Sequence, residues 1–253
     1  MLLTRVMPCL LLRNWGLVKT IKFDSPKYVG DPINTVRIYN EKEVDELIFL
    51  DITATKNNKQ PPFQIISEIA SECFMPFTYG GGIKNIEDAK TIYNIGVEKI
   101  AVNSYALENP EFISELANTF GNQSVVVSID AKKGFFGKYK VCTQGGTKAS
   151  KFNPVEFAIM MEKMGAGEIL LTSIDNDGVM EGYDIELIQS VSNAVNIPVI
   201  ACGGAGCVED FKDAVKNGGA SAVAAGSMVV YQGKNRAVLI NFPDRKELEK
   251  LLS

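Results

Sequence analysis

The sequence contains no histidine, and this absence limits the chemistry open to the chain. Histidine-based catalytic triads, Cys-His nucleophilic pairs and histidine-ligated zinc sites are excluded. General acid–base catalysis is therefore expected from carboxylates, lysine, cysteine or tyrosine. No pattern in the sequence indicates a metal or a cofactor, and we expect neither.

Other features are also scarce. No apolar run approaches about 18 residues, so we expect no membrane span. There is no cluster of lysine and arginine, and a net charge of −4 argues against a nucleic-acid partner. The five cysteines form no CxxC pair, which indicates reduced thiols in a cytoplasmic protein. They are Cys9, Cys73, Cys142, Cys202 and Cys207.

An internal repeat is the strongest organising feature of the chain. Residues 76–104 (PFTYGGGIKNIEDAKTIYNIGVEKIAVNS) resemble residues 198–227 (PVIACGGAGCVEDFKDAVKNGGASAVAAGS), whose first residue lies 122 positions later. Gly82 aligns with Gly204 and, further upstream, Glu46 aligns with Glu168. A repeat of about half the chain predicts one domain, 1–253, built from two half-barrels at about 1–120 and 121–253.

Short apolar runs alternate with helical segments along the chain. The alternation predicts an α/β fold, a closed (β/α)8 TIM barrel; an open doubly wound sheet is the alternative, but it lacks a GxGxxG turn after the first strand. Residues 13–30 show no clear period and are expected to form an irregular lid, and 134–142 a small hairpin. The expected strands are 6–12, 46–51, 76–79, 99–102, 124–130, 168–173, 198–202 and 222–225.

The repeated glycine pairs predict anion binding. A strand that ends at Gly-Gly before a helix leaves free N–H groups at the positive end of the helix dipole, where phosphate binds. One such pair would more simply make a tight turn, but two copies at a fixed spacing favour two phosphate sites, one in each half.

Candidate residues for chemistry follow the strands, because a barrel places its active face at their C-terminal ends. Asp130 ends an apolar strand and is a candidate general acid or base; a helix cap or an ion-pair partner for a lysine is the alternative. Asp177 and Gly178 are expected to help hold a phosphate, with capping again the alternative. The strand ends are Leu11, Asp51, Gly81, Gly82, Asn103, Asp130, Thr172, Ser173, Asp175, Asp177, Gly203, Gly204 and Ser227.

Four charged residues lie at the opposite ends of the strands. If they point inward, they form a ring of two positive and two negative charges at the barrel floor; alternatively, each simply meets solvent. They are Arg5, Glu46, Lys99 and Glu168.

Several long motifs together resemble the cyclase subunit of imidazole glycerol phosphate synthase. That family is a lyase-type (β/α)8 barrel that binds a substrate with two phosphates and receives ammonia from a separate glutaminase docked at the barrel bottom. The motifs are RVMPCLLL, GDPINTVRIYNEKEVDELIFLDITA, YGGGIKNIEDAK, ALENPEFISELANTFGNQSVVVSIDAK, GAGEILLTSIDNDGVMEGYD and IACGGAG.

The resemblance implies a role for each matching residue. Asp130 corresponds to one of the two catalytic carboxylates, Lys19 lies in the first lid, and Thr172 is expected among the substrate-binding residues. One phosphate site would comprise Gly82, Asn103 and Ser104; the other would comprise Asp177, Gly178, Gly204, Gly226 and Ser227; the ammonia gate would be Arg5, Glu46, Lys99 and Glu168.

The first strand departs from the family pattern. The family has Cys-Leu-Asp where this chain has Cys9-Leu10-Leu11, and the internal repeat likewise places Leu11 opposite Asp130. Leucine cannot move a proton, so the usual cyclisation should be poor. The segment PCLLL resembles a paralogous branch that acts in surface-polysaccharide biosynthesis, where a glutaminase-like partner helps to amidate a sugar nucleotide.

Four hypotheses follow from these observations. The first is an ammonia-accepting synthase subunit of a surface-glycan amidotransferase, with a glutaminase partner and a phosphorylated or sugar-nucleotide acceptor. The second is an authentic cyclase subunit of histidine biosynthesis that tolerates Leu11. The third is a catalytically silent ammonia conduit, and the fourth is an aldose–ketose isomerase barrel, which would not need a charged gate.

Overall fold

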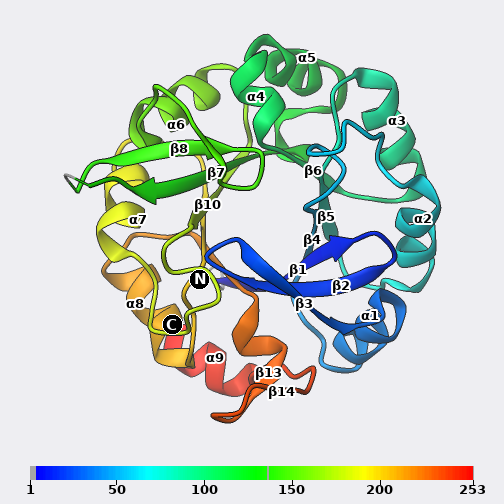
Figure 1. The fold of residues 1–253 in the computed structure, drawn as a ribbon, viewed down its shortest axis with the longest axis vertical. Helices are drawn as coiled ribbons and strands as arrows, with labels where there is room; N and C mark the ends of the chain where they lie inside the picture. The colour runs from blue at the N-terminus through cyan, green and yellow to red at the C-terminus, as the bar shows by residue number, and fades with distance from the viewer. Residues whose placement is uncertain (1–3, 136, 253) are drawn as a thin grey trace.

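Eight parallel strands close into a barrel in the computed structural model, which describes residues 4–135 and 137–252 (Figure 1). The strand pairing runs around the whole ring and returns from β12 to β1, where Arg5 lies opposite Ala222. The (β/α)8 prediction is confirmed. The barrel strands are β1 (Arg5–Arg13), β4 (Leu47–Asp51), β5 (Phe77–Gly80), β6 (Lys99–Val102), β7 (Val125–Lys133), β10 (Glu168–Ser173), β11 (Val199–Cys202) and β12 (Ala222–Ala225).

Helices surround the strands in Figure 1, and polar caps begin several of them. Asp31 and Asn153 each accept a backbone N–H at the start of a helix whose first residue is proline, as Asp-Pro and Asn-Pro pairs predict. The outer helices are α1 (Pro32–Glu41), α2 (Phe63–Glu72), α3 (Ile86–Ile95), α5 (Glu111–Phe120), α6 (Pro154–Lys163), α7 (Ile185–Ser192), α8 (Val208–Lys216) and α9 (Arg245–Leu252). Three short helices join them: α4 (Ser104–Glu108), η1 (Asn122–Ser124) and η2 (Ser227–Val229).

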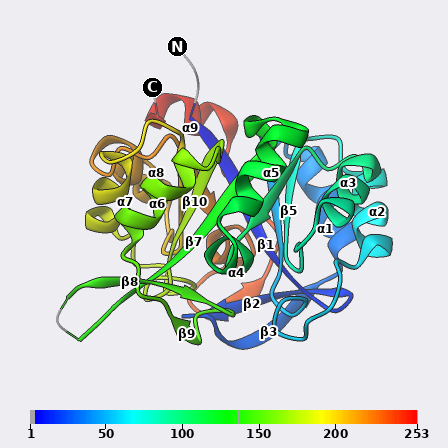
Figure 2. The same cartoon turned by 90° about the horizontal axis from the view of Figure 1, so that it is seen from above.

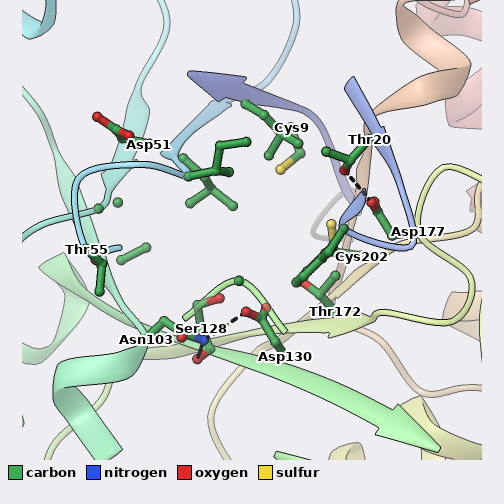
Figure 3. A pocket seen from close by; sticks show the side chains of 18 of the residues that line it. Cys9, Thr20, Asp51, Thr55, Asn103, Ser128, Asp130, Thr172, Asp177 and Cys202 are labelled. Carbon is green, nitrogen blue, oxygen red and sulfur yellow. Dashed lines mark hydrogen bonds between the residues drawn. The ribbon is translucent and has the colours of Figure 1, made fainter. Parts of the chain in front are cut away.

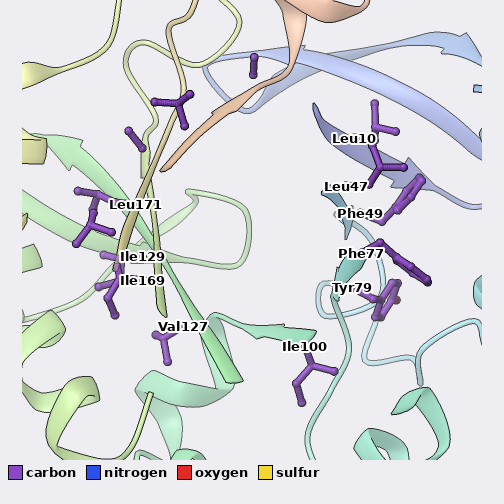
Figure 4. Packing of buried hydrophobic residues seen from close by; sticks show 14 of the residues in the cluster. Leu10, Leu47, Phe49, Phe77, Tyr79, Ile100, Val127, Ile129, Ile169 and Leu171 are labelled. Atoms are coloured by element: carbon purple, nitrogen blue, oxygen red, sulfur yellow. The ribbon is translucent and has the colours of Figure 1, made fainter. Parts of the chain in front are cut away.

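Two separate apolar layers stabilise the barrel. The larger layer lies between strands and helices, where residues such as Phe49, Phe77 and Leu171 are fully or almost fully buried (Figure 4). The smaller layer fills the barrel interior and contains Met7 and Ile48 among small residues such as alanine. Side chains alternate between the two layers along each strand, which explains why the strands read as continuous apolar runs.

The expectation that residues 13–30 lack regular structure is wrong. This segment forms β2 (Gly16–Ile21) and β3 (Asp24–Gly30), and β2 pairs antiparallel with the end of β1. Four successive residues of β2, from Leu17 to Thr20, are buried, so the segment has no alternation for a sequence pattern to reveal. Its partner is the long end of β1, which continues beyond the barrel to Arg13.

A second extension projects from the same end of the barrel (Figure 2). Strand β7 runs on into an antiparallel pair with β8 (Tyr139–Thr143), which pairs with β9 (Lys148–Ala149), so the predicted hairpin is confirmed. A small pair, β13 (Tyr231–Gln232) and β14 (Ala237–Val238), precedes α9. Within residues 4–135 and 137–252, no helix has the length and apolar character needed to cross a bilayer.

Candidate functional site

A deep cavity opens at the C-terminal ends of the barrel strands, with about 1310 Å³ of empty space counted out to its open mouth. It collects the predicted catalytic, substrate-binding and phosphate-binding positions from both halves of the chain (Figure 3). These lining residues are Lys19, Gly82, Asn103, Ser104, Asp130, Thr172, Asp177, Gly178, Gly204, Gly226 and Ser227. Asp175 points elsewhere: its carboxylate accepts the backbone N–H of Lys133 at 2.8 Å.

Asp130 lines this cavity, where its surroundings suit an acid–base group. The amide of Asn103 donates to its Oδ2 at 3.2 Å and to the carbonyl oxygen of Ser128 at 2.9 Å (Figure 3). Burial raises the pKa of Asp130 to about 7, with a further contribution from the charge of Asp177. Its carboxyl group therefore exchanges a proton near neutral pH, the range in which acid–base catalysis is most effective. No lysine in the described part of the chain forms an ion pair with it.

Asp177 ties the β2–β3 extension to the cavity rim. Thr20 donates from its hydroxyl to Oδ2 of Asp177 at 3.0 Å, and the backbone N–H of Lys22 donates to its carbonyl oxygen at 2.8 Å. Burial raises the pKa of Asp177, while Lys19 and Thr20 oppose that rise. Gly178 packs so closely on the carbonyl of Thr20 that no side chain fits there.

Lys19 brings a cation into the cavity from β2. It is 4% exposed, and its Nζ donates to the carbonyl oxygen of Cys9 at 3.2 Å. No carboxylate lies within ion-pair distance of this ammonium group in the described residues. A buried cation without a paired anion favours a negatively charged ligand.

The two glycine corners have the geometry of anion sites. Gly82 and Gly204 both have positive φ angles, +77° and +125°, and each lies against backbone atoms that leave no room for a Cβ. Near the second corner, Ser227 Oγ is buried and has no hydrogen-bond partner among the described residues. A phosphate oxygen at this corner could accept hydrogen bonds from that hydroxyl and from nearby backbone N–H groups.

The four charged residues at the barrel floor point inward and form a closed ring of ion pairs. Arg5 donates to Glu46 at 2.7 Å and to Glu168 at 2.8 Å, and Lys99 contacts the same two carboxylates at 3.1 and 3.2 Å. Burial lowers the pKa of Arg5, but the two glutamates outweigh this effect and raise it overall. The alternative that each charge simply meets solvent is wrong, because Glu46 is only 4% exposed.

Several lining residues were not predicted from the sequence. Thr20 lies on β2, which no local pattern revealed, and Gln144 lies in the turn between β8 and β9, just past the predicted hairpin. Cys9 and Cys202 were assigned only as buried thiols, yet both line the cavity. Strand alternation could have found Cys9, because it lies two residues before Leu11 on the same face of β1. Among the described residues, no group of three or more Cys, Asp or Glu side chains is arranged to hold a metal ion.

This architecture defines the class of protein: a closed (β/α)8 barrel with a cavity at the C-terminal ends of its strands and a ring of four charged residues at the other end. The chain belongs to the histidine biosynthesis protein family, whose sequence profile matches residues 5–236. The resemblance to the cyclase subunit of imidazole glycerol phosphate synthase is thereby confirmed.

Individual relatives cover nearly the whole chain. A protein of Pseudomonas aeruginosa, provisionally named imidazole glycerol phosphate synthase subunit hisF2, is 54% identical over 97% of this chain and 98% of its own length. A provisionally named hisF3 of Vibrio vulnificus is 48% identical over 100% and 97%. The imidazole glycerol phosphate synthase subunit HisF of Alkaliphilus metalliredigens is 43% identical over 91% and 92%.

Proposed function

We propose that this chain is the synthase subunit of a glutamine amidotransferase pair. It accepts ammonia from a separate glutaminase at the barrel floor and delivers it through the interior to a phosphorylated acceptor in the cavity. The acceptor we propose is a sugar nucleotide on the route to an amidated surface glycan. The observation that carries the proposal is that the closed ring of charged residues and the cavity lined by Lys19 and the glycine corners lie at opposite ends of one barrel.

The interior between these two ends suits ammonia rather than ammonium. Above the ring, the barrel is lined by Met7, Ile48, Ala101 and Ala222. An apolar lining disfavours a charged species but admits a small neutral one. A separate glutaminase supplies the ammonia, because a chain without histidine lacks the Cys-His pair that hydrolyses glutamine.

The catalytic contribution of the cavity centres on Asp130. With a pKa of about 7 it can give or take a proton as the nitrogen adds to the acceptor. Lys19, Ser227 and the glycine corner at Gly204 would hold a phosphate of the acceptor. All five cysteines are free, which suits the reducing cytoplasm that we propose as the place of action.

Isotope competition tests this proposal in the purified complex. The chain would be co-expressed with its glutaminase and supplied with amide-15N glutamine, excess unlabelled ammonium and a nucleotide-linked N-acetylamino sugar. Channelled transfer predicts that the product keeps the 15N label, and the Arg5→Met variant should lose it. Product labelled only by the bulk ammonium, or no complex with a glutaminase, would contradict the proposal.

A second candidate is the authentic cyclase of histidine biosynthesis. The 43% identity to a protein named HisF favours it, as does the hydrogen bond that positions Asp130 beside Asn103. Complementation of a histidine-requiring strain that lacks its cyclase subunit separates the two candidates. Robust growth would replace our proposal with this one.

The apolar Leu11 favours a third candidate, a conduit that passes ammonia to another protein without chemistry of its own. The Asp130→Asn variant distinguishes this case. A conduit keeps full glycan amidation in cells, whereas a synthase loses most of it, because one acid–base group contributes about 10²–10⁴-fold.

A further inference from the structure

We infer that only one of the two repeat-related glycine corners, the corner at Gly204, binds an anion, and that the corner at Gly82 receives an uncharged part of the acceptor. The inference rests on the proposed function and describes its acceptor more closely. That acceptor is a sugar joined to a single anionic group, the diphosphate of a nucleotide. A molecule with a separate phosphate at each end does not match the cavity.

The hydrogen-bond donors at the Gly82 corner are already engaged within the chain. The backbone N–H of Gly82 donates to the hydroxyl oxygen of Thr55 at 3.2 Å. The side-chain amide of Asn103 donates to the carbonyl oxygen of Ser128 at 2.9 Å and to the carboxylate of Asp130 at 3.2 Å. An anion at this corner would have to replace such bonds, so it would gain little net free energy from them.

Ser104, the serine of the same corner, is engaged as well. Its hydroxyl donates to Oδ1 of Asn103 at 3.2 Å and accepts the backbone N–H of Gln144 at 3.1 Å. Gln144 lies in the turn between β8 and β9, so this turn reaches the Gly82 corner. The serine therefore fixes the turn, and its hydroxyl is not free for a phosphate oxygen.

The corresponding groups at the Gly204 corner have no such partners. Ser227 follows β12 as Ser104 follows β6; it is 5% exposed, and its Oγ has no hydrogen-bond partner in the described ranges 4–135 and 137–252. Lys19 packs against Gly226 and, within the same ranges, has no carboxylate at ion-pair distance. A buried hydroxyl without a partner and a buried ammonium without a paired charge both favour a bound anion.

The cavity wall beside the Gly82 corner is apolar. Leu11 on β1 pairs with Leu50 on β4, and Leu50 pairs with Gly80 on β5, two residues before Gly82. All three paired residues line the cavity. Because an apolar wall disfavours a charged group, this side suits an uncharged part of the ligand.

The wall of the second half is polar at the equivalent places. Asp130 on β7 pairs with Thr172 on β10, and Thr172 pairs with Cys202 on β11. The internal repeat aligns Asp130 with Leu11 and Thr172 with Leu50. Figure 3 shows Thr172 and Cys202 across the cavity from Thr55. The two halves thus share a backbone plan but present different chemistry to a ligand.

Two lysines at the rim of the first-half side do not alter this assignment. Lys84 donates to the side-chain oxygen of Asn58 at 2.8 Å, and Lys56 is exposed and packs on Gly145. An exposed cation is hydrated and screened by salt, so it holds an anion less tightly than the buried Lys19 does.

A matched pair of serine variants tests the difference between the corners. The dissociation constant of inorganic pyrophosphate would be measured by isothermal titration calorimetry on the full chain. Ser227→Ala should raise it at least about tenfold, because a hydrogen bond to a charged group is lost, whereas Ser104→Ala should change it less than about twofold. Similar losses in both variants, a loss in Ser104→Ala alone, or no binding to the unmodified chain at millimolar pyrophosphate would overturn the inference.

A comparison of ligands with one and two phosphates needs no variant. The unmodified chain would be titrated with the bisphosphate substrate of the cyclase family and with imidazole glycerol phosphate, which carries one phosphate. Two working corners predict that the bisphosphate binds about 10²–10⁴-fold more tightly, whereas we expect an advantage below about tenfold. A larger advantage would overturn the inference. Neither titration requires ammonia transfer, so failure of the isotope experiment would remove the proposed function while these affinities still decide between one anion corner and two.

Discussion

The ammonium group of Lys19 lies against the backbone of Gly226, in the space that a Cβ atom at position 226 would fill. The two residues come from opposite ends of the chain and meet only because β12 closes the barrel beside β1. This contact places a buried cation at the corner where Ser227 carries its unpaired hydroxyl. We therefore expect Lys19 and the corner at Gly226 to form one anion site.

The Gly226→Ala substitution should weaken anion binding. The added methyl group must displace Lys19 Nζ from its place beside residue 226. The displaced ammonium group then contributes less to anion binding. We expect the dissociation constant for inorganic pyrophosphate, measured by isothermal titration calorimetry, to rise at least about tenfold. Lys19→Met should have a similar effect, and the double variant should add little to either. Unchanged affinity in both single variants would show that this corner binds no anion.

Replacement of Asp130 by asparagine should stabilise the protein at high pH. A free aspartate ionises near pH 3.8, whereas Asp130 in the folded protein ionises near pH 7. As pH rises between these values, the unfolded state releases a proton that the folded state keeps, so the folded state loses stability. The full shift corresponds to at most about 4 kcal/mol, and we expect about half because the carboxyl also faces the open cavity.

Urea unfolding at pH 4 and pH 8 measures this difference. Asp130→Asn should raise the free energy of unfolding by about 2 kcal/mol at pH 8 and change it little at pH 4. Glu115→Gln on the exposed face of α5 is the control, and its effect on the free energy of unfolding should be the same at pH 4 and pH 8. A gain for Asp130→Asn that is independent of pH would contradict an elevated pKa.

The barrel could be predicted from the sequence because each of its strands is indicated by a short apolar run of neighbouring residues. β10 (Glu168–Ser173) and β6 (Lys99–Val102) have the bounds that their apolar runs predicted. The glycine corners at Gly82 and Gly204 could also be predicted, because glycine adopts positive φ angles more readily than other residues.

The rest of the site depends on contacts between distant segments. β2 was missed because its stability comes from pairing with the extended end of β1, where Leu11 lies opposite Val18. Without that strand, neither Thr20 nor the buried position of Lys19 could be placed in the cavity. The bond between Asn103 and Asp130 likewise requires the pairing of β6 with β7, which a single sequence does not display.

Removal of Arg5 should destabilise the fold more than removal of an exposed arginine. Arg5→Met leaves Glu46 and Glu168, both largely buried, to share the single cation of Lys99. Breaking a largely buried network of this kind typically costs about 3 kcal/mol. Urea unfolding at pH 7 would measure the loss. Arg37→Met, which breaks an exposed pair with Glu72, is the matched control and should show no resolvable change.

Introduction of an acid at position 11 tests whether Leu11 explains a lack of cyclase activity. Leu11 is 8% exposed and lines the cavity, on the β1 position where the resemblance to the cyclase family implies an aspartate. Leu11→Asp therefore returns a proton-transfer group to the first strand, at a stability cost of about 2 kcal/mol for the buried carboxyl. We expect imidazole glycerol phosphate formation from the bisphosphate substrate, with ammonium chloride as nitrogen source, to rise at least about 100-fold.

Leu11→Asn separates the proton from the change of shape, because asparagine is isosteric with aspartate but cannot accept a proton in this range. It should stay at the wild-type level while Leu11→Asp gains activity. Equal gains in both variants would mean that Leu11 merely blocks the substrate. No gain in a folded Leu11→Asp variant would instead show that this cavity is shaped for a different acceptor, since Asp130 and both glycine corners would then be present without supporting cyclisation.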